Sequence, residues 1–317
     1  MDDNKENEWE RDLVNRLTFA AVNEQRRARR WNIFFRTLML VWLFSLIAIL
    51  YPATKEPFKK VTGSHTALVE VAGVIAANTE ANADSVITAL RKAFENDQSK
   101  AVIVRINSPG GSPVQAGYIN DEMIRLRDKY PDKPLYAVIT DICASGGYYI
   151  AAAADKIYAD KASIVGSIGV LMDGFGFVET LDKLGIERRL LTAGKHKGFL
   201  DPFSPQKEEE VKHIKTVLDS IHQQFIDAVK NGRGDKLVDN ENLYSGYVWT
   251  GEKSVEMGLV DELGSSSYIA RELVGEEKIV DYTLRPNYLD RFAERLGAAM
   301  GNVLATTLGL QQGPVLK

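Results

Sequence analysis

Residues 101–120 read AVIVRINSPGGSPVQAGYIN, a pattern that predicts a buried strand, a tight turn and the start of a helix. Apart from Arg105, the first six residues are apolar and mostly β-branched, which is typical of a strand. Proline and two glycines then turn the chain. Apolar residues next recur at helical spacing, at Ala116, Ile119, Met123 and Leu126. These residues predict one strand–turn–helix unit.

The same unit occurs before and after this stretch. ALVEVAGVIAA at 67–77 predicts a strand, and the segment at 84–96 has helical spacing. LYAVIT at 135–140 predicts a third strand, and the Ala-rich stretch after Ser145 predicts a helix. Strands that alternate with helices in this way indicate an α/β fold with a largely parallel sheet.

A longer amphipathic helix is predicted farther on. Ser204 is a good N-cap and Pro205 suits the first helical position, while Asn231-Gly232 favours the end of the helix. Its apolar stripe consists of Val211, Ile214, Leu218, Ile221 and Phe225. We expect this stripe to pack on the domain or on a neighbouring subunit.

Composition excludes several classes of function. The 317 residues are 45% hydrophobic and carry a net charge of −4, so no basic field favours nucleic acid as a partner. Cys143 is the single cysteine, which rules out an intramolecular disulfide and a Cys/His zinc cage. We expect no metal and no cofactor.

The run at 37–54 carries no charged side chain and follows an Arg-rich block at 26–30. It predicts one transmembrane helix at 31–53, with the N-terminus in the cytoplasm because positive charge stays on that side. A cleaved signal peptide or a buried core helix are the alternatives. Thirty charged and amphipathic residues precede the run, which disfavours a signal peptide.

Two glycine-rich turns follow predicted strands, at 107–111 and 144–147. Ligands gather at the carboxyl ends of strands in parallel sheets, and a serine at a strand-to-helix turn is exposed beside free N–H groups. Ser145 is therefore a candidate nucleophile. The Gly146 N–H, with that of Gly110 or Gly111, is a candidate oxyanion hole. Either turn could instead only reverse the chain and have no catalytic role.

A nucleophilic serine needs a base. Of the four histidines, only His196 lies in a Gly-flanked loop, within TAGKHKGFLDPFSP at 192–205. The same loop offers Lys195 and Lys197, and a lysine shielded by apolar neighbours can lose its proton and act as a general base. Phe199, Leu200 and Phe203 could provide that shield. The alternative is two exposed lysines on a surface loop.

Five motifs now occur in order: VIVRINSPGGSPVQAGYI, VITDICASGGYYIAAAADKIYAD, SIVGSIGV, GKHKGFLDPFSP and WTGEKSVEMGLVDELGS. Together they resemble the signal peptide peptidase A (protease IV) family, from about residue 67 to 264. The resemblance implies a Clp protease/crotonase-like fold. It also implies a hydrolase, a serine endopeptidase of the short, single-repeat bacterial form.

The resemblance assigns roles by motif. Ser145 would be the nucleophile, Lys197 the general base and Ser167 a hydroxyl that orients the lysine amine. The oxyanion donors would come from the turns that hold Gly110, Gly111 and Gly146. Cys143 would be a buried bystander.

The family also implies homo-oligomers in which serine and lysine from neighbouring subunits meet. We expect apolar peptide substrates such as signal-peptide remnants, no nucleic acid, and an anchor in the lipid bilayer of a bacterial inner membrane, with the catalytic domain periplasmic. The expected divisions are a cytoplasmic segment (1–30), the anchor (31–53), a linker (54–64), the peptidase domain (65–285) and a C-terminal tail (286–317).

Two other classes stay open. A crotonase-like acyl-CoA enzyme would use a similar pair of glycine N–H groups for a thioester enolate, but usually needs a catalytic carboxylate and no anchor. A non-catalytic membrane scaffold would not need Ser145 and Lys197 to be intact.

Overall fold

A computed structural model of the protein describes residues 3–54 and 63–285. The chain divides into two compact units. One contains the 52-residue helix α1 (Asp3–Thr54), and the other, Val61–Pro286, contains the sheet. The predicted tail at 286–317 and most of the predicted linker lie outside the described residues.

Helix α1 is continuous through the residues predicted as cytoplasmic segment and anchor. Its large apolar side chains between Trp31 and Phe44 are exposed. Within the described ranges, no helix combines the length and the apolar character needed to cross a membrane. The predicted transmembrane helix is therefore not confirmed.

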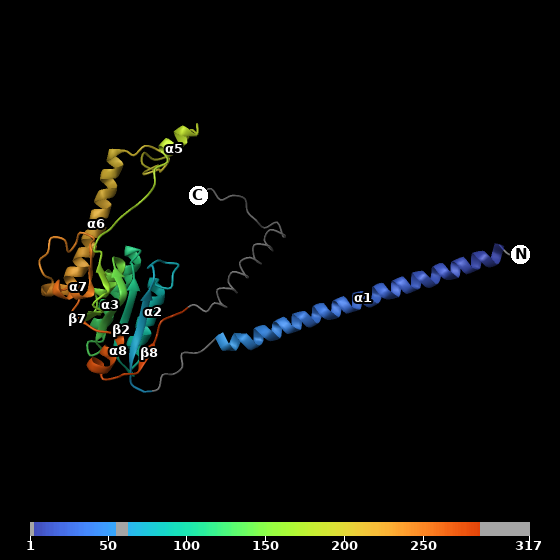
Figure 1. Cartoon of the computed structure of the whole chain (residues 1–317), viewed down its shortest axis with the longest axis horizontal. Coiled ribbons are helices and arrows are strands. Elements are labelled where there is room, and N and C mark those ends of the chain that lie inside the picture. Colours follow the sequence, from blue (N-terminus) through green and yellow to red (C-terminus); the bar gives the residue numbers. More distant parts are fainter. Residues whose placement is uncertain (1–2, 55–62, 286–317) are drawn as a thin grey trace. The chain divides into compact units, whose positions relative to one another are not determined.

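The second unit is built on one sheet of eight strands (Figure 1). The strands are β1 (His65–Ala72), β2 (Ser99–Ser108), β3 (Leu135–Ala144), β4 (Lys156–Ala159), β5 (Ile164–Gly166), β6 (Val248–Thr250), β7 (Glu262–Leu263) and β8 (Ile279–Asp281). Their order is β6-β5-β3-β2-β1-β8, and β4 joins β3 to β7. Every pairing is parallel except that of β5 with β6, so the α/β prediction is confirmed.

Strand β3 changes partner along its length. Its first half, from Tyr136 to Ile139, pairs with β4, and its second half pairs with β5, where Ala144 lies opposite Gly166. The residues that follow this last pair are Ser145 and Ser167. The register therefore places these two serines side by side at one end of the sheet.

The first strand is shorter than the predicted 67–77. It ends at Ala72, because Gly73 turns the chain with φ 77°. Ile75 then forms an isolated parallel bridge with Gly111, which ties the chain after β1 to the turn after β2.

At the edge of the sheet, β8 pairs with β1 and brings the two ends of the unit together. A ring nitrogen of His65 and the hydroxyl oxygen of Tyr282 share a hydrogen bond of 2.9 Å. Both side chains are buried.

The helices of this unit are α2 (Ala83–Glu95), α3 (Pro113–Lys129), α4 (Gly146–Ala151), α5 (Val178–Lys183), α6 (Glu208–Arg233), α7 (Gly251–Glu256) and α8 (Ser266–Tyr268), with a 3₁₀ turn at Gly234–Lys236 and a π-helical turn at Ile269–Val274. Side-chain caps begin the two long helices beside the sheet: Asn82 accepts from the Ser85 N–H, and Ser112 accepts from the Gln115 N–H. Their apolar faces are buried in the core with the strands.

The predicted start of α6 is wrong. The helix begins at Glu208 after Lys207, not at Ser204. The Ser204 hydroxyl donates to the Asp201 carboxylate at 2.7 Å, so it is engaged within the preceding loop. At the other end, a Cβ on Gly232 would overlap the Ala152 carbonyl oxygen, and the helix continues to Arg233. This glycine lets α6 approach α4 closely.

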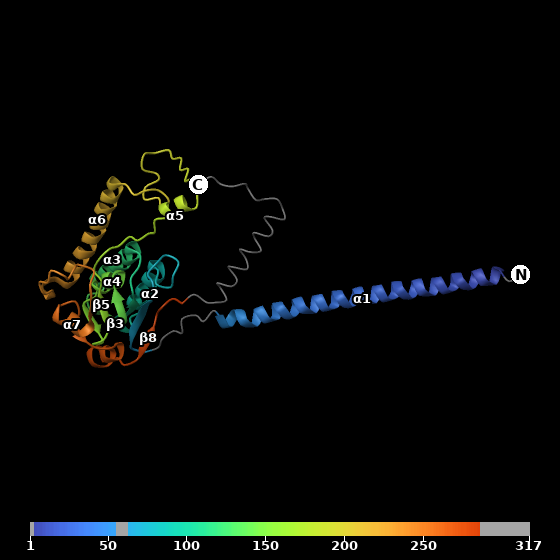
Figure 2. The same ribbon diagram turned by 45° about the horizontal axis from the view of Figure 1, so that its top comes forward.

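The two ends of α6 have different surroundings. Near its C-terminal end, Phe225 and Val229 are buried, and Phe225 stacks on Tyr149 at 5.0 Å between ring centroids. The predicted stripe residues before Phe225 are only half-buried. Figures 1 and 2 show this N-terminal part extending away from the sheet toward the segment that contains α5. We call residues 171–209 the arm; none of them is buried.

Candidate active site

Ser145 lies at the turn between β3 and α4 in a rare backbone conformation, with φ 51° and ψ −122°. Positive φ is uncommon for a residue with a side chain and concentrates at functional sites. The strand pairing holds this conformation, because the Ser145 N–H donates to the Gly166 carbonyl at 2.9 Å. The side chain is half-buried, which leaves its hydroxyl accessible.

The turn after β2 packs directly against this serine. A Cβ on Gly110 would lie 2.7 Å from the Gly146 nitrogen and 2.7 Å from the Ser145 Cβ. A Cβ on Gly111 would overlap the Ile75 carbonyl. Only glycine fits at either position, so this close approach explains the SPGG sequence.

Backbone hydrogen bonds distinguish the candidate oxyanion donors. The Gly110 N–H donates to the Ser108 hydroxyl at 3.1 Å and is already used. The Ile75 N–H donates to the Gly110 carbonyl, and the Ile75 carbonyl accepts from the Ser112 N–H. Because these two bonds form the parallel bridge between Ile75 and Gly111, the Gly111 N–H itself points away from Ile75. The Gly146 N–H belongs to the first turn of α4, where N–H groups have no partner within the helix. Gly111 and Gly146 thus provide two N–H groups beside Ser145.

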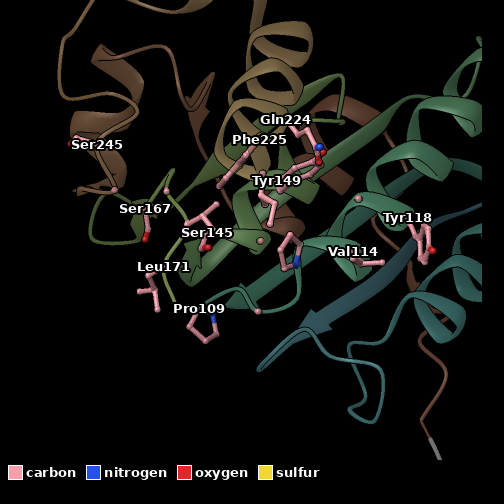
Figure 3. Close-up of a pocket in the computed structure, with 18 of the residues that line it drawn as sticks. Pro109, Val114, Tyr118, Ser145, Tyr149, Ser167, Leu171, Gln224, Phe225 and Ser245 are labelled. Carbon is pink, nitrogen blue, oxygen red and sulfur yellow. The ribbon is translucent and has the colours of Figure 1, made fainter. Parts of the chain in front are cut away.

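A cavity of about 800 Å³ opens at this point. Ser145, Ser167, Gly111 and Gly146 all line it, and Figure 3 shows both serine side chains at its wall. Most of the remaining wall is apolar or aromatic, with Tyr149 and Phe225 among the residues drawn. An extended peptide segment would fit such a cavity.

Ser167 follows β5 and has φ 52°, a second rare conformation. Its N–H donates to the Tyr247 carbonyl at 2.7 Å. Gly166 before it packs against the Trp249 ring, where a Cβ would lie 2.8 Å from the ring carbon Cε3. The fold therefore holds Ser167 at the same end of the sheet as Ser145.

Lys197 lies elsewhere. It is exposed on the arm and does not line the cavity that contains Ser145. Lys195 and His196 beside it are also exposed, and the Lys195 amine approaches Glu209 at 3.7 Å. Within one chain, the structure brings together Ser145, Ser167 and the three glycines, but not the predicted base.

The loop that carries Lys197 has an anchoring point of its own. Glu210, buried at the start of α6, accepts from the Leu200 N–H at 3.2 Å and from the Lys207 amine at 3.1 Å. The Leu200 N–H, and next Lys207, hold the pKa of Glu210 below its usual value. Leu200 itself has φ 52°. The arm is exposed, but this part of it has a defined conformation.

Cys143 cannot replace the serine as nucleophile. It is fully buried in β3, and burial raises the pKa of its thiol far above neutrality. Among the described residues, no group of three or more His, Cys, Asp or Glu side chains could hold a metal ion.

The sequence prediction missed the wall formed by α3. Pro113, Val114, Gly117, Tyr118 and Asp121 all line the cavity. Their i, i+4, i+8 spacing places them on one face of the helix, next to the face that enters the core. The position of this helix directly after the SPGG turn was the available signal.

Known proteins resemble the chain to different extents. A model of peptidase family S49 matches residues 127–280. A putative signal peptide peptidase SppA of Enterococcus faecium is 33% identical over 251 residues, which are 77% of this chain and 72% of that protein. A putative protease of Synechocystis is 34% identical over 209 residues, 66% of this chain and 73% of that protein.

A further relative has a different name. A protein of Brucella abortus called Na(+)/H(+) antiporter NhaA is 46% identical over 190 residues, or 59% of this chain. The match spans only a quarter (25%) of that protein's length. Because the match covers so little of that protein, its name is not carried over to this chain.

The E. faecium and Synechocystis relatives are matched over most of their length, and the mixed α/β sheet fits a Clp-protease-like fold. This chain belongs to peptidase family S49, among relatives similar to signal peptide peptidase A.

Proposed function

We propose that the protein is a membrane-anchored serine endopeptidase that cleaves apolar peptides with Ser145 as nucleophile and Lys197 as general base. The observation that carries the proposal is the geometry at Ser145. A serine with φ 51° lies beside two outward N–H groups, those of Gly111 and Gly146, in the wall of a peptide-sized cavity. This arrangement suits acyl transfer.

In the proposed reaction, the neutral Lys197 amine accepts the proton of the Ser145 hydroxyl while the serine oxygen attacks the scissile carbonyl. The resulting oxyanion accepts hydrogen bonds from Gly111 and Gly146. The lysine ammonium then gives its proton to the leaving amine, which leaves an acyl-enzyme. Lys197 next removes a proton from water as the hydroxide attacks the ester carbonyl. The bond to the Ser145 oxygen then breaks, the acid product leaves, and the Lys197 ammonium returns the proton to Ser145.

The base must come from outside the cavity of its own chain. Because Lys197 is exposed on the arm and Ser145 is in the cavity wall, we propose that lysine and serine of neighbouring subunits form each site in a homo-oligomer. Ser167 would orient the lysine amine, since its backbone lies beside that of Ser145. The exposed apolar residues of the arm, including Leu171, Phe175 and Leu191, would be covered in such an assembly.

An activity-based fluorophosphonate probe tests the chemistry. We expect it to label the full-length protein, and we expect Ser145→Ala and Lys197→Ala to abolish labelling. An acyl-CoA enzyme or a scaffold would not be labelled at Ser145. Labelling of the wild type that persists in Ser145→Ala would refute the assignment of the nucleophile.

The substrate and location rest on the sequence and the relatives. The SppA name of the E. faecium relative supports signal-peptide remnants as substrates. The charge-free run at 37–54 after the Arg-rich block supports an inner-membrane anchor with a periplasmic catalytic domain. A reporter fused after Lys317 that is active only in the cytoplasm would exclude this topology.

A further inference from the structure

The residues that line the cavity beside Ser145 carry a single formal charge. Of the nineteen lining residues, only Asp121 has a formally charged side chain. The others are glycines, prolines, small polar residues, and apolar or aromatic side chains. A peptide bound there would therefore meet one fixed negative charge in an otherwise neutral wall.

Asp121 is not neutralised by the protein itself. Its side chain is exposed, and it forms no hydrogen bond or ion pair with any residue of the described ranges. The carboxylate is close enough to Tyr149 to act on it: burial, and next the charges of Asp121 and Asp227, raise the pKa of the Tyr149 hydroxyl. Tyr149 also lines the cavity, so the negative charge acts on its interior.

The distance from the nucleophile follows from helix geometry. Ser145 packs against the turn that leads into α3, and Pro113, Val114, Gly117, Tyr118 and Asp121 line the cavity along that helix. Figure 3 shows Val114 and Tyr118 successively farther from Ser145. Asp121 lies nine residues after the N-cap Ser112, or roughly 14 Å along the axis. An extended peptide covers this distance in about four residues.

We propose that Asp121 forms a subsite for a positively charged group of the substrate, about three to five residues from the bond that is cut. This inference rests on the proposed peptidase function and narrows its substrate class. The preferred peptide is apolar near the scissile bond and carries a Lys or Arg side chain, or a free N-terminal ammonium, at the far end of the cavity.

The expected gain is limited because Asp121 is exposed. Exposed ion pairs are weak, and a carboxylate in a partly enclosed wall contributes more, so a preference of about threefold to tenfold is expected. The preference should fall as salt rises, since mobile ions screen exposed charges.

A lysine scan tests the subsite. Internally quenched, N-acetylated peptides of alanine and leucine would carry one lysine, moved through six positions on each side of the cut, and each would be matched by a norleucine peptide. The readout is the ratio of kcat/KM for lysine to that for norleucine, with the full-length protein. We expect one maximum of about threefold to tenfold, three to five residues from the cut.

Three variants of α3 provide the comparison. Asp121→Asn should bring this ratio close to one, and Asp121→Lys should transfer the preference to a glutamate peptide. Asp128→Asn removes the same charge from an exposed residue of the same helix that does not line the cavity, and should keep the ratio. A peptide with a free N-terminal amine can be compared with its acetylated form. If wild type prefers the free amine and Asp121→Asn does not, the bound cation is the N-terminal ammonium, which would support the subsite.

The outcomes separate the two proposals. If the wild type cleaves no peptide, or Ser145→Ala cleaves as well as wild type, the proposed function fails. Fluorescence anisotropy of labelled lysine and norleucine peptides with Ser145→Ala would still test the subsite by binding. Peptides that are cleaved with no lysine preference at any position, or with one that survives Asp121→Asn, would overturn the inference about Asp121.

Discussion

The surroundings of Ser145 and of Lys197 are built in opposite ways. Ser145 directly follows β3, and a Cβ on the neighbouring Gly110 would lie 2.7 Å from the Ser145 Cβ. Lys197 lies in the arm, where no residue from 171 to 209 is buried. The proposed nucleophile and its proposed oxyanion donors lie in turns packed against each other at the end of the sheet, whereas the proposed base lies on the exposed arm.

This difference has a physical reason. Oxyanion donors stabilise developing charge only if they are fixed before the reaction, which requires dense packing around them. In the proposed homo-oligomer, the general base needs to reach the serine only after the subunits have assembled. A base on an arm without a core of its own can therefore link activity to assembly, since subunits that remain apart would lack it.

The largest expected effect is the loss of the base without loss of the fold. Lys197→Ala should lower kcat/KM by about a thousandfold or more, as loss of a base does in serine triads. Lys197→Arg should be equally inactive, because guanidinium stays protonated. The melting temperature should not change, since Lys197 is exposed.

His196→Ala is the matched control on the same loop and should keep most of the activity. The rate of the wild type should continue to rise with pH beyond about 6.5, where an imidazole base would level off. An inactive His196 variant with an active Lys197 variant would assign the base to histidine and contradict the proposal.

Mixing two inactive variants tests whether the arm serves a neighbour. Ser145→Ala and Lys197→Ala, unfolded and refolded together in equal amounts, should regain about a quarter of the wild-type activity, because that share of random neighbouring pairs combines an intact serine with an intact lysine. The gain over either variant would be several hundredfold. A mixture as inactive as its components would place both groups in one subunit.

Glycine-to-alanine changes compare the packing of the two regions. Gly110→Ala should lower kcat about a hundredfold, because the added Cβ would displace the Ser145 turn and the Gly146 N–H. Gly174→Ala on the arm meets nothing within 4 Å and should have little effect on activity or melting temperature. Equal losses in the two variants would show that the arm is packed as tightly as the core.

The smallest expected effect concerns acid. Glu122 on α3 accepts hydrogen bonds from Arg125 and Arg91, which outweigh burial and lower its pKa from 4.5 to about 2. A pKa lowered in the folded state stabilises the fold above the unfolded pKa, and this stabilisation is lost as the pH falls from about 4.5 to 2. Because both arginines are half exposed, we expect it to be on the order of 1 kcal/mol.

Glu122→Gln should therefore lower the free energy of unfolding at pH 7 by about that amount, and the difference from wild type should disappear near pH 2. Glu187→Gln removes an exposed pair with Arg189 on the arm and should change neither stability nor its pH dependence. Urea unfolding at a series of pH values would measure both. A constant difference down to pH 2 would mean that the charge of Glu122 is not its cause.

The strand–turn–helix units were predictable because their signals are local. The β-branched run of β2, the Pro/Gly turn and the Ser112 cap act within a few residues of one another. They also bring Ser145 near Gly110, since consecutive parallel strands end at one edge of the sheet. Such features need no knowledge of distant contacts.

Features set by distant or competing contacts were not predictable. The partner change of β3 depends on where β4 and β5 return to the sheet. Ser204 has the residue type of an N-cap, but Asp201 competes for its hydroxyl. The end of α6 was predicted to within about two residues, but the close packing of Gly232 against Ala152 is invisible in the sequence. Asp121 was missed because the sequence does not show which face of α3 lines a cavity, although this helix directly follows the SPGG turn.

The pairing of β8 with β1 closes the second unit on itself, since the hydrogen bond between His65 and Tyr282 holds its first and last strands together. A domain whose first and last residues lie close together can be inserted into another protein, because the host chain is interrupted at a single point. Gene fusion could thus attach it to hosts of unrelated function with little change in its interior. Circularly permuted versions, with a short peptide joining the two ends and new termini at an exposed turn, should fold as well as the parent.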